Sequence, residues 1–332
     1  MAILITGAAG FIGYHLAKRL LRENQPVIGF DNLNEYYDVS LKQSRLDELS
    51  KYPAFTFIRG NLADKELIAG IFEKHRPQVV VNLAAQAGVR YSIINPDAYI
   101  ESNVVGFYNI LEACRHSGDD GRRPVGHLLY ASSSSVYGNQ QKTPFCVSDN
   151  VDHPISLYAA TKKSNELMAY TYSHLYSIPT TGLRFFTVYG PAGRPDMAYY
   201  SFTKKILAGV ALQVYNNGDM YRDFTYVDDI INGIMNMLGK PPQGPDPAKI
   251  YNIGNNKPVQ LMRFIHALEE ALSRAYGREL KANIEYLPMQ PGDVYQTYAD
   301  VDDLMRDFGF KPSTSIEEGL ARFAQWYKDY DM

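Results

Sequence analysis

The sequence predicts an α/β fold in which a doubly wound parallel sheet is followed by a smaller C-terminal lobe. Short apolar runs alternate with helical patterns up to about residue 185, which indicates a parallel sheet with helices on both faces. Beyond Pro191 the elements become shorter and turn-forming residues become more frequent. We therefore expect a first domain at residues 1–190, to which some later elements return, and a second lobe mainly at residues 191–332.

The first expected strand is Ala2–Thr6, an aliphatic run without polar alternation, as in parallel strands that are buried on both faces. Glycines follow at positions 7, 10 and 13, and apolar residues recur at helical spacing from Phe11. Such a join permits a tight turn, lets a pyrophosphate approach the backbone, and aims helix N–H groups at the phosphate. The spacing G-x-x-G-x-x-G differs from the common Rossmann fingerprint, so a glycine-rich turn without a ligand is the alternative.

The second expected strand, Val27–Phe30, ends in Asp31. An acid at this distance from the glycines would hold the adenosine ribose hydroxyls and repel a 2′-phosphate. The predicted cofactor is therefore NAD rather than NADP.

Further strands and helices alternate along the rest of the first domain. Strands are expected at Phe55–Ile58, Gln78–Leu83, Gly126–Ala131 and Thr180–Phe185, and helices at about Val39–Lys51, Asp64–His75, Asp97–His116 and Ser156–Tyr176. Ligands of such sheets bind at the carboxyl ends of the strands. Those ends are Gly7, Asp31, Asn61, Ala84 and Ser132.

Composition excludes several classes of function. The 45% hydrophobic content is enough for a large core, and the net charge of −3 without a basic stripe argues against nucleic acid or an anionic membrane as partner. Cys114 and Cys146 are too few for a disulfide framework or a thiolate metal site, and no histidine spacing suggests a metal. We expect no metal, no membrane span and a cytoplasmic location.

Three Tyr-x-x-x-Lys pairs place a phenol and an ammonium one helical turn apart: Tyr14/Lys18, Tyr158/Lys162 and Tyr200/Lys204. Only Tyr158/Lys162 begins a helix after the strand that ends in Ser132-Ser133-Ser134. One positive charge at about 6 Å, with an effective dielectric constant of ~20, lowers the pKa of a phenol by roughly two units. Tyr158 could then act as a general base, with Ser133 or Ser134 hydrogen-bonding the reacting oxygen. A surface i,i+4 pair is the alternative.

A set of motifs completes the pattern: GAAGFIG, Asp31, NLAAQAGVRYS, Asn103, SSSSVYG, Tyr158-Ala-Ala-Thr-Lys162, LRFFTVYGP and RDFTYVDD. Over essentially the whole chain they resemble the extended short-chain dehydrogenase/reductases that act on nucleotide sugars, and most of all the UDP-glucuronate 4-epimerases. The resemblance implies oxidation at C4 by bound NAD⁺, rotation of the 4-keto sugar, and return of the hydride to its other face.

The resemblance also implies the residues of the site. Cofactor contacts fall on Gly7, Gly10, Phe11, Ile12 and Gly13 for the pyrophosphate, Asp31 for the ribose, Asn61 and Leu62 for the adenine, and further on Asn32, Leu83, Ala84, Ala85, Asn103, Ser132, Tyr158 and Lys162. The family often has Asp where this chain has Asn61. Substrate contacts fall on Arg90, Ser133, Ser134, Tyr158, Thr187, Arg194, Arg222 and Asp293, and catalytic roles on Tyr158, Lys162, Ser133 and Ser134.

At some positions this chain differs from related branches of the superfamily, and these differences indicate which reaction to expect. Dehydratases and decarboxylases of this superfamily usually carry Glu before Val-Tyr-Gly, whereas this chain has Ser135. Thr187 stands where galactose epimerases typically have Asn, and with Arg194 it suits a hexuronate carboxylate. The alternatives are that Arg194 and Arg222 are surface residues and that Arg90 only holds its own loop in place. Asp293 resembles a ribose contact.

The expected function is therefore the interconversion of UDP-glucuronate and UDP-galacturonate. The rivals are a UDP-glucose/UDP-galactose 4-epimerase, a UDP-glucuronate decarboxylase, and an NAD-sensing regulator without catalysis. The resemblance also implies a homodimer, in which Asp97–His116 and Ser156–Tyr176 of each subunit form a four-helix bundle.

Overall fold

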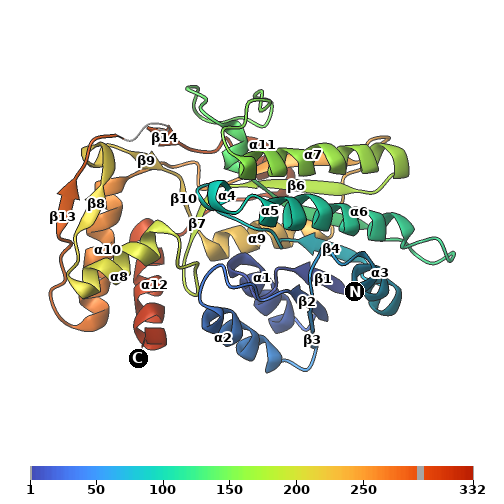
Figure 1. The fold of residues 1–332 in the computed structure, drawn as a ribbon, viewed down its shortest axis with the longest axis horizontal. Helices are drawn as coiled ribbons and strands as arrows, with labels where there is room; N and C mark the ends of the chain where they lie inside the picture. The colour runs from blue at the N-terminus through green and yellow to red at the C-terminus, as the bar shows by residue number, and fades with distance from the viewer. Residues whose placement is uncertain (1, 290–294, 332) are drawn as a thin grey trace. The chain divides into compact units, whose positions relative to one another are not determined.

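A computed structural model describes residues 2–289 and 295–331, and it divides the chain into two compact units (Figure 1). Unit 1 comprises the described residues up to Gly138, Val147–Phe185 and Gly233–Asn252. Unit 2 comprises Asn139–Cys146, Phe186–Asn232 and the described residues from Ile253 onward. The segment Gly233–Asn252 thus returns to the first unit.

Unit 1 is built on a sheet that has seven strands within the described residues, in the order β11-β6-β5-β4-β1-β2-β3. The strands are β1 (Ile3–Thr6), β2 (Val27–Asp31), β3 (Phe55–Arg59), β4 (Val79–Asn82), β5 (His127–Ser133), β6 (Thr180–Phe185) and β11 (Ala248–Ile253). The pairs from β3 across to β6 are parallel. The strand order reverses beside β1, and such a reversal is where ligands of doubly wound sheets bind. The predicted fold class is confirmed.

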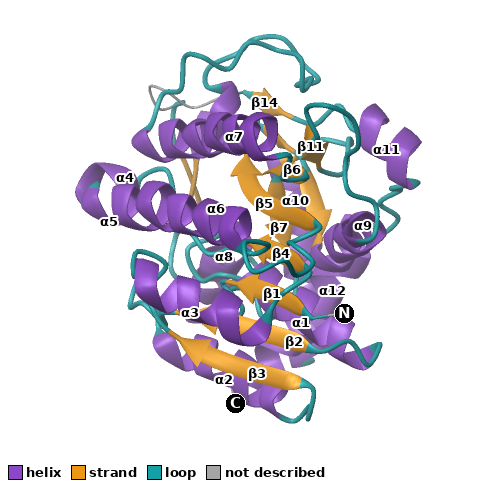
Figure 2. Cartoon of the chain, turned by 90° about the vertical axis from the view of Figure 1, so that its right-hand side faces the viewer, coloured by secondary structure: helices purple, strands orange, loops and turns teal. Residues whose placement is uncertain are grey.

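Helices cover both faces of this sheet. They are α1 (Phe11–Arg22), α2 (Val39–Ser50), α3 (Lys65–His75), α4 (Tyr91–Ile94), α5 (Asp97–Tyr99), α6 (Gly106–His116) and α7 (Leu157–Tyr176), together with the C-terminal half of α9 (Val227–Leu238). One core packs α3, α6 and α7 against β1, β2, β4 and β5 through residues such as Ile71, Leu111 and Leu128. Figure 2 shows α6 and α7 side by side on that face. No helix in the described part of the chain has the length and apolarity to cross a membrane.

Side-chain caps explain where α3 and α7 begin. The carboxylate of Asp64 accepts the Leu67 N–H at 2.9 Å, and the Ser156 hydroxyl oxygen accepts the Ala159 N–H at 3.1 Å. Each bond satisfies one of the N–H groups that a helix start leaves without a partner.

Two elements differ from the expectation by more than one residue at an end or by an interruption. The helix expected over Asp97–His116 is interrupted by a π-helical segment, η1 (Ile100–Val105), because the wider turn inserts an extra residue that periodicity does not reveal. β5 runs on to Ser133 rather than ending at Ala131, because Ser132 and Ser133 pair with Arg184 and Phe185 of β6. The serines therefore begin inside the sheet.

Unit 2 contains small sheets and an aromatic core. Its strands are β7 (Thr187–Tyr189), β8 (Leu212–Val214), β9 (Tyr221–Arg222), β10 (Phe224–Tyr226), β12 (Val259–Gln260), β13 (Ile284–Tyr286) and β14 (Gln296–Thr297). Its helices are α8 (Ala198–Ala208), α10 (Leu261–Tyr276), α11 (Asp302–Phe308), α12 (Ile316–Asp331) and the first half of α9. Tyr199 packs edge-on against Phe323 of α12, with ring centroids 4.9 Å apart.

Candidate active site

The turn from β1 to α1 leaves no room for side chains at the three glycines. A Cβ atom at Gly13 would lie 2.1 Å from the Gly7 carbonyl oxygen, and one at Gly7 would lie 2.8 Å from the backbone nitrogen of Ala84. Gly7 also has φ of +72°, which favours glycine. Helix α1 begins at Phe11 after Gly10, which has no side chain to cap the first-turn N–H groups. Backbone donors at a helix start suit a pyrophosphate, so the turn fits a dinucleotide.

Two buried charged side chains hold Ala9, in the middle of this turn. The Ala9 N–H donates to Asp31 Oδ2 at 3.1 Å, and the Ala9 carbonyl accepts from Arg45 Nη1 at 2.7 Å. Asp31 Oδ1 accepts the Leu33 N–H, and the amide oxygen of Asn32 accepts the Asn34 N–H. The acid predicted to hold the ribose therefore lies against the predicted phosphate-binding turn.

The sequence analysis does not identify Arg45. Its guanidinium is only 1% exposed and also donates to the Tyr37 hydroxyl at 2.8 Å. In the sequence it stands among polar residues of a helix, where a charged residue ordinarily faces solvent. Only the fold shows that Arg45 supports the glycine turn.

The residues assigned to adenine lie beyond β3. The Asn61 amide donates to the Glu101 carboxylate at 2.7 Å, while its oxygen accepts the Ala63 N–H at 3.0 Å. Leu62 is buried, and its carbonyl accepts from the Asn109 amide at 2.8 Å. These bonds fix the loop at the carboxyl end of β3.

The chain that follows β4 is held against the end of β1. The Leu83 N–H donates to the Thr6 carbonyl at 3.2 Å, and the Ala84 N–H donates to the Thr6 hydroxyl oxygen at 3.1 Å. Ala85 comes next, half-buried. The segment therefore lies beside the glycine turn.

Asn103 lies in the π-helical segment and is 1% exposed. Its amide nitrogen donates to the Gln86 carbonyl at 3.0 Å and to the Thr161 hydroxyl oxygen at 3.0 Å, and its amide oxygen accepts the Gln86 N–H at 2.8 Å. Both amide hydrogens are thus used within the protein. The side chain ties the loop after β4 to the residue before Lys162, which is a positioning role.

Lys162 is the buried member of the three Tyr-x-x-x-Lys pairs. It is 3% exposed, its Nζ donates to the Ala131 carbonyl at 2.8 Å, and burial lowers the pKa of its ammonium to about 8. By contrast, Lys18 donates to the Tyr14 hydroxyl, and Lys204 is exposed, 5.3 Å from the centre of the Tyr200 ring. The environment therefore distinguishes Lys162, whose charge lies in a medium that screens it weakly.

Tyr158 lies one turn before Lys162 on α7, and its ring meets the edge of Tyr99 at 6.0 Å between centroids. Ser133 ends β5 and Ser134 begins the short helix η2 (Ser134–Tyr137). The Ser133 hydroxyl oxygen accepts the Ser135 N–H at 3.1 Å. The predicted catalytic residues thus come from three elements of unit 1, because α7 packs against both the end of β5 and η2.

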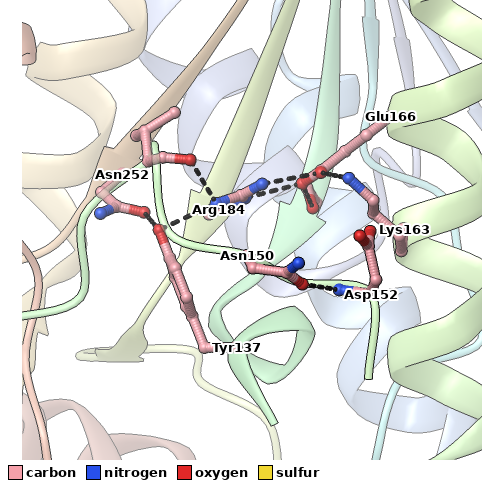
Figure 3. A network of polar contacts seen from close by, with 9 residues as sticks. Tyr137, Asn150, Asp152, Lys163, Glu166, Arg184 and Asn252 are labelled. Atoms are coloured by element: carbon pink, nitrogen blue, oxygen red, sulfur yellow. Dashed lines mark hydrogen bonds and ion pairs between the residues drawn. The ribbon is translucent and has the colours of Figure 1, made fainter. Parts of the chain in front are cut away.

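Ser132 belongs to a buried polar network around Glu166 and Arg184; Figure 3 shows these two residues with Tyr137 and Asn252. The Ser132 hydroxyl donates to Glu166 at 2.6 Å, and Glu166 forms a bidentate ion pair with Arg184. Tyr137 and Asn252 extend the network. The sequence analysis does not select these residues, although a charged residue inside the buried strand Thr180–Phe185 is a signal that it has a buried partner.

Unit 2 carries three of the predicted substrate contacts, Thr187, Arg194 and Arg222. Thr187 begins β7 opposite Phe224 of β10. Arg194 pairs with Asp196, with Nε 3.0 Å from Oδ1, a partner that the sequence analysis does not name. Arg222 Nη1 donates to the carbonyls of Tyr221 and Tyr295.

Two further predicted substrate contacts are Arg90 and Asp293. Arg90 is exposed and lies in unit 1, immediately before α4. Asp293 lies outside the described residues.

Known proteins match the chain along nearly all of its length. The family model described as GDP-mannose 4,6 dehydratase matches residues 4–323. Protein CapI of Staphylococcus aureus is 56% identical over 99% of each chain. A probable UDP-glucuronate 4-epimerase of Rhizobium meliloti is 45% identical over 98% of this chain and 97% of that one.

A solved structure agrees with these relatives. The crystal structure of UDP-glucuronic acid 4-epimerase from Bacillus cereus, in complex with UDP-glucuronic acid and NAD, is 32% identical and covers 99% of this chain and 100% of that one, with a TM-score of 0.87. The chain therefore belongs to the GDP-mannose 4,6 dehydratase family of NAD-dependent epimerases and dehydratases.

Proposed function

We propose that the protein is an NAD-dependent 4-epimerase that interconverts UDP-glucuronate and UDP-galacturonate. The observation that carries this proposal is the buried ammonium of Lys162, one helical turn from Tyr158 and bonded to the end of β5, where the serines begin. The relative from Rhizobium meliloti and the structure from Bacillus cereus, both named as 4-epimerases of this substrate, support the same reaction.

The residues of unit 1 would perform the proton transfer. The charge of Lys162 stabilises the phenolate form of Tyr158, which takes the proton of the sugar 4-hydroxyl and becomes a phenol. Ser133 or Ser134 donates a hydrogen bond to the same oxygen as it becomes a carbonyl oxygen. When bound, NAD would supply the redox chemistry at C4, as the acceptor of the hydride and its donor to the opposite face of the rotated sugar. Tyr158 then returns the proton, so the reaction consumes no cofactor.

The glycine turn, Asp31 and the residues around them would hold the cofactor. The first-turn N–H groups of α1 suit the pyrophosphate, and the carboxylate of Asp31 suits the ribose hydroxyls. The tight packing at Gly7 and Gly13 supports this assignment, because any side chain there would displace the backbone that forms the turn.

Substrate choice rests on residues of unit 2. We assign the hexuronate carboxylate to Arg194 and the Thr187 hydroxyl, and the UDP phosphates to Arg222. Asp196 holds the Arg194 guanidinium in the structure, so a substrate carboxylate has to compete with it. Ser135 supports epimerisation over dehydration, since a 4,6-elimination needs an acid/base at C5.

The test is to incubate the purified protein with UDP-glucuronate, without added cofactor, and to follow the products by NMR. UDP-galacturonate is the expected product, formed until an equilibrium mixture is reached. Release of CO₂ with formation of a UDP-pentose would identify a decarboxylase instead. Turnover of UDP-glucose alone would identify a neutral-sugar epimerase, and function that survives Tyr158→Phe would point to a regulator without catalysis.

We also propose that the protein is a homodimer that packs through α6 and α7. Large apolar side chains are exposed on α7, among them Leu167, Tyr170 and Leu175, of which Leu175 is 59% exposed. Ile93 and Ile94 of α4, which contacts α7, are also exposed, Ile93 by 80%, as is Tyr108 of α6. Exposed apolar residues gathered on adjacent helices are typical of a protein interface. Light scattering of the wild type should give the mass of a dimer, whereas Leu167→Glu/Leu175→Glu should give a monomer. A monomeric wild type would refute the assignment.

We also propose that the protein is located in the cytoplasm. Cys114 and Cys146 form no disulfide within the described residues, which is compatible with the reducing cytoplasm that the sequence predicts. Fractionation of cells that express the protein would test this location.

A further inference from the structure

The serine segment, residues 133–136, lies next to a buried ion pair that the proposed reaction does not use. Arg184 on β6 and Glu166 on α7 are joined by two bonds, Nε to Oε1 at 2.8 Å and Nη2 to Oε2 at 2.9 Å. Their side chains are 2% and 1% exposed. A bidentate pair of this kind fixes the orientation of both side chains, since each oxygen has its own donor.

Both ends of the serine segment are attached to this ion pair. Before it, the Ser132 hydroxyl donates to Glu166 Oε1 at 2.6 Å. After it, the Tyr137 hydroxyl accepts from Arg184 Nη1 at 3.0 Å and donates to Asn252 Oδ1 at 2.6 Å. Figure 3 shows how Arg184 lies between Glu166 and Tyr137.

The same ion pair also connects the segment to the helix that carries the proposed base. Glu166 lies one turn beyond Lys162 on α7. Lys162 Nζ donates to the carbonyl of Ala131, the residue before Ser132. Two successive residues at the end of β5 are therefore bound to two side chains one turn apart on α7. These bonds set the distance from the serine hydroxyls to the helix face of Tyr158.

We propose that Arg184, Glu166 and Tyr137 are positioning residues for the epimerisation, which hold the serine segment at a fixed distance from Tyr158 and Lys162. This inference rests on the proposed function. Hydrogen bonds to a reacting oxygen depend steeply on geometry, and a displacement of about 1 Å can lower the rate about 100-fold. A segment held at both ends is protected from such displacement.

The variant that tests the proposal is Tyr137→Phe. It removes one of the two attachments and leaves the Glu166–Arg184 pair intact, so no charge is left without its partner in the core. We expect a kcat about tenfold lower, with the KM for UDP-glucuronate and the bound NAD unchanged. Amide hydrogen exchange in residues 133–138 should become about tenfold faster, because the segment opens more often.

The matched control is Tyr172→Phe. It removes the Tyr172 hydroxyl, which donates to Glu112 at 2.8 Å. Tyr172 lies on α7, as Lys162 does, but more than two turns beyond Lys162. This variant should change neither kcat nor hydrogen exchange in residues 133–138. If both variants lower kcat equally, Tyr137 contributes only general stability, and the proposal is overturned.

A double-mutant cycle shows whether the effect passes through the serines. In the Ser133→Ala/Ser134→Ala background, Tyr137→Phe should lower kcat by less than about twofold, because the hydroxyls it positions are gone. Losses that simply multiply would overturn the proposal, as would unchanged hydrogen exchange in Tyr137→Phe. A wild type that does not convert UDP-glucuronate would instead overturn the proposed function. The exchange measurement needs no substrate, so the two failures are distinguishable.

Discussion

Replacing Lys162 with Met should change how the free energy of unfolding depends on pH, because the Lys162 ammonium is buried in the folded chain. Burial lowers the pKa of Lys162 from 10.5 to about 8 in the folded chain, while the unfolded chain keeps the ordinary value. Between these two pKa values the unfolded state binds more protons than the folded state. The wild type therefore gains stability as pH rises through this range.

The magnitude follows from the size of the pKa shift. Below pH 8 both states are protonated, and the folded state carries the full cost of a buried charge, about 3 kcal/mol at about 1.4 kcal/mol per pKa unit. Between pH 7 and pH 10 about 2 kcal/mol of this cost disappears, because the folded lysine loses its proton first. Lys162→Met has no proton to lose there, so its free energy of unfolding should lack this increase.

The assay is urea unfolding of cofactor-free protein between pH 7 and pH 10. Subtracting the Lys162→Met curve from the wild-type curve removes the contribution of all other titrating groups. Lys204→Met is the control, because Lys204 is exposed and should leave the wild-type pH dependence unchanged. If the wild type and Lys162→Met differ by a constant amount at every pH, then Lys162 does not titrate as a buried charge and the reasoning fails.

Further predictions concern single steps of the proposed reaction. Tyr158→Phe should lower kcat by about 10²- to 10⁴-fold without loss of bound NAD, as measured by NMR turnover and by absorbance of the released cofactor. Arg194→Ala should raise the KM for UDP-glucuronate about tenfold or more and leave any turnover of UDP-glucose unchanged, which steady-state kinetics with both sugars will show. Arg45→Met should weaken NAD binding by about 10- to 100-fold in calorimetry, since it leaves the Ala9 carbonyl buried without its donor.

Much of the fold could be predicted because its signals are local. A buried parallel strand is a short aliphatic run, and the strand predicted at Thr180–Phe185 has those limits in the structure. The cap at Asp64 was predictable for the same reason, because a capping side chain bonds to a backbone group three residues away. The three glycines are also a local signal, since each one relieves a clash within the same turn or with its neighbouring strand.

The tertiary structure decided which charged residues support the site. Arg45 and Ala9 are 36 residues apart, and Glu166 and Arg184 are 18 apart. No periodicity relates such partners, because the contact arises only when a helix packs on a sheet. The π-helical turn at Asn103 is likewise hidden, since helical spacing looks almost the same with one residue added.

The sequence by itself determined the α/β class and the glycine turn with Asp31, and it predicts Tyr158 and Lys162 as the catalytic pair among three similar pairs. It could do so because strands, caps and helical spacing are set by neighbours along the chain. Only the tertiary structure decided that Lys162 is buried with its pKa near 8, and that one ion pair holds both ends of the serine segment. Burial and long-range hydrogen bonds exist only once distant parts of the chain exclude water together.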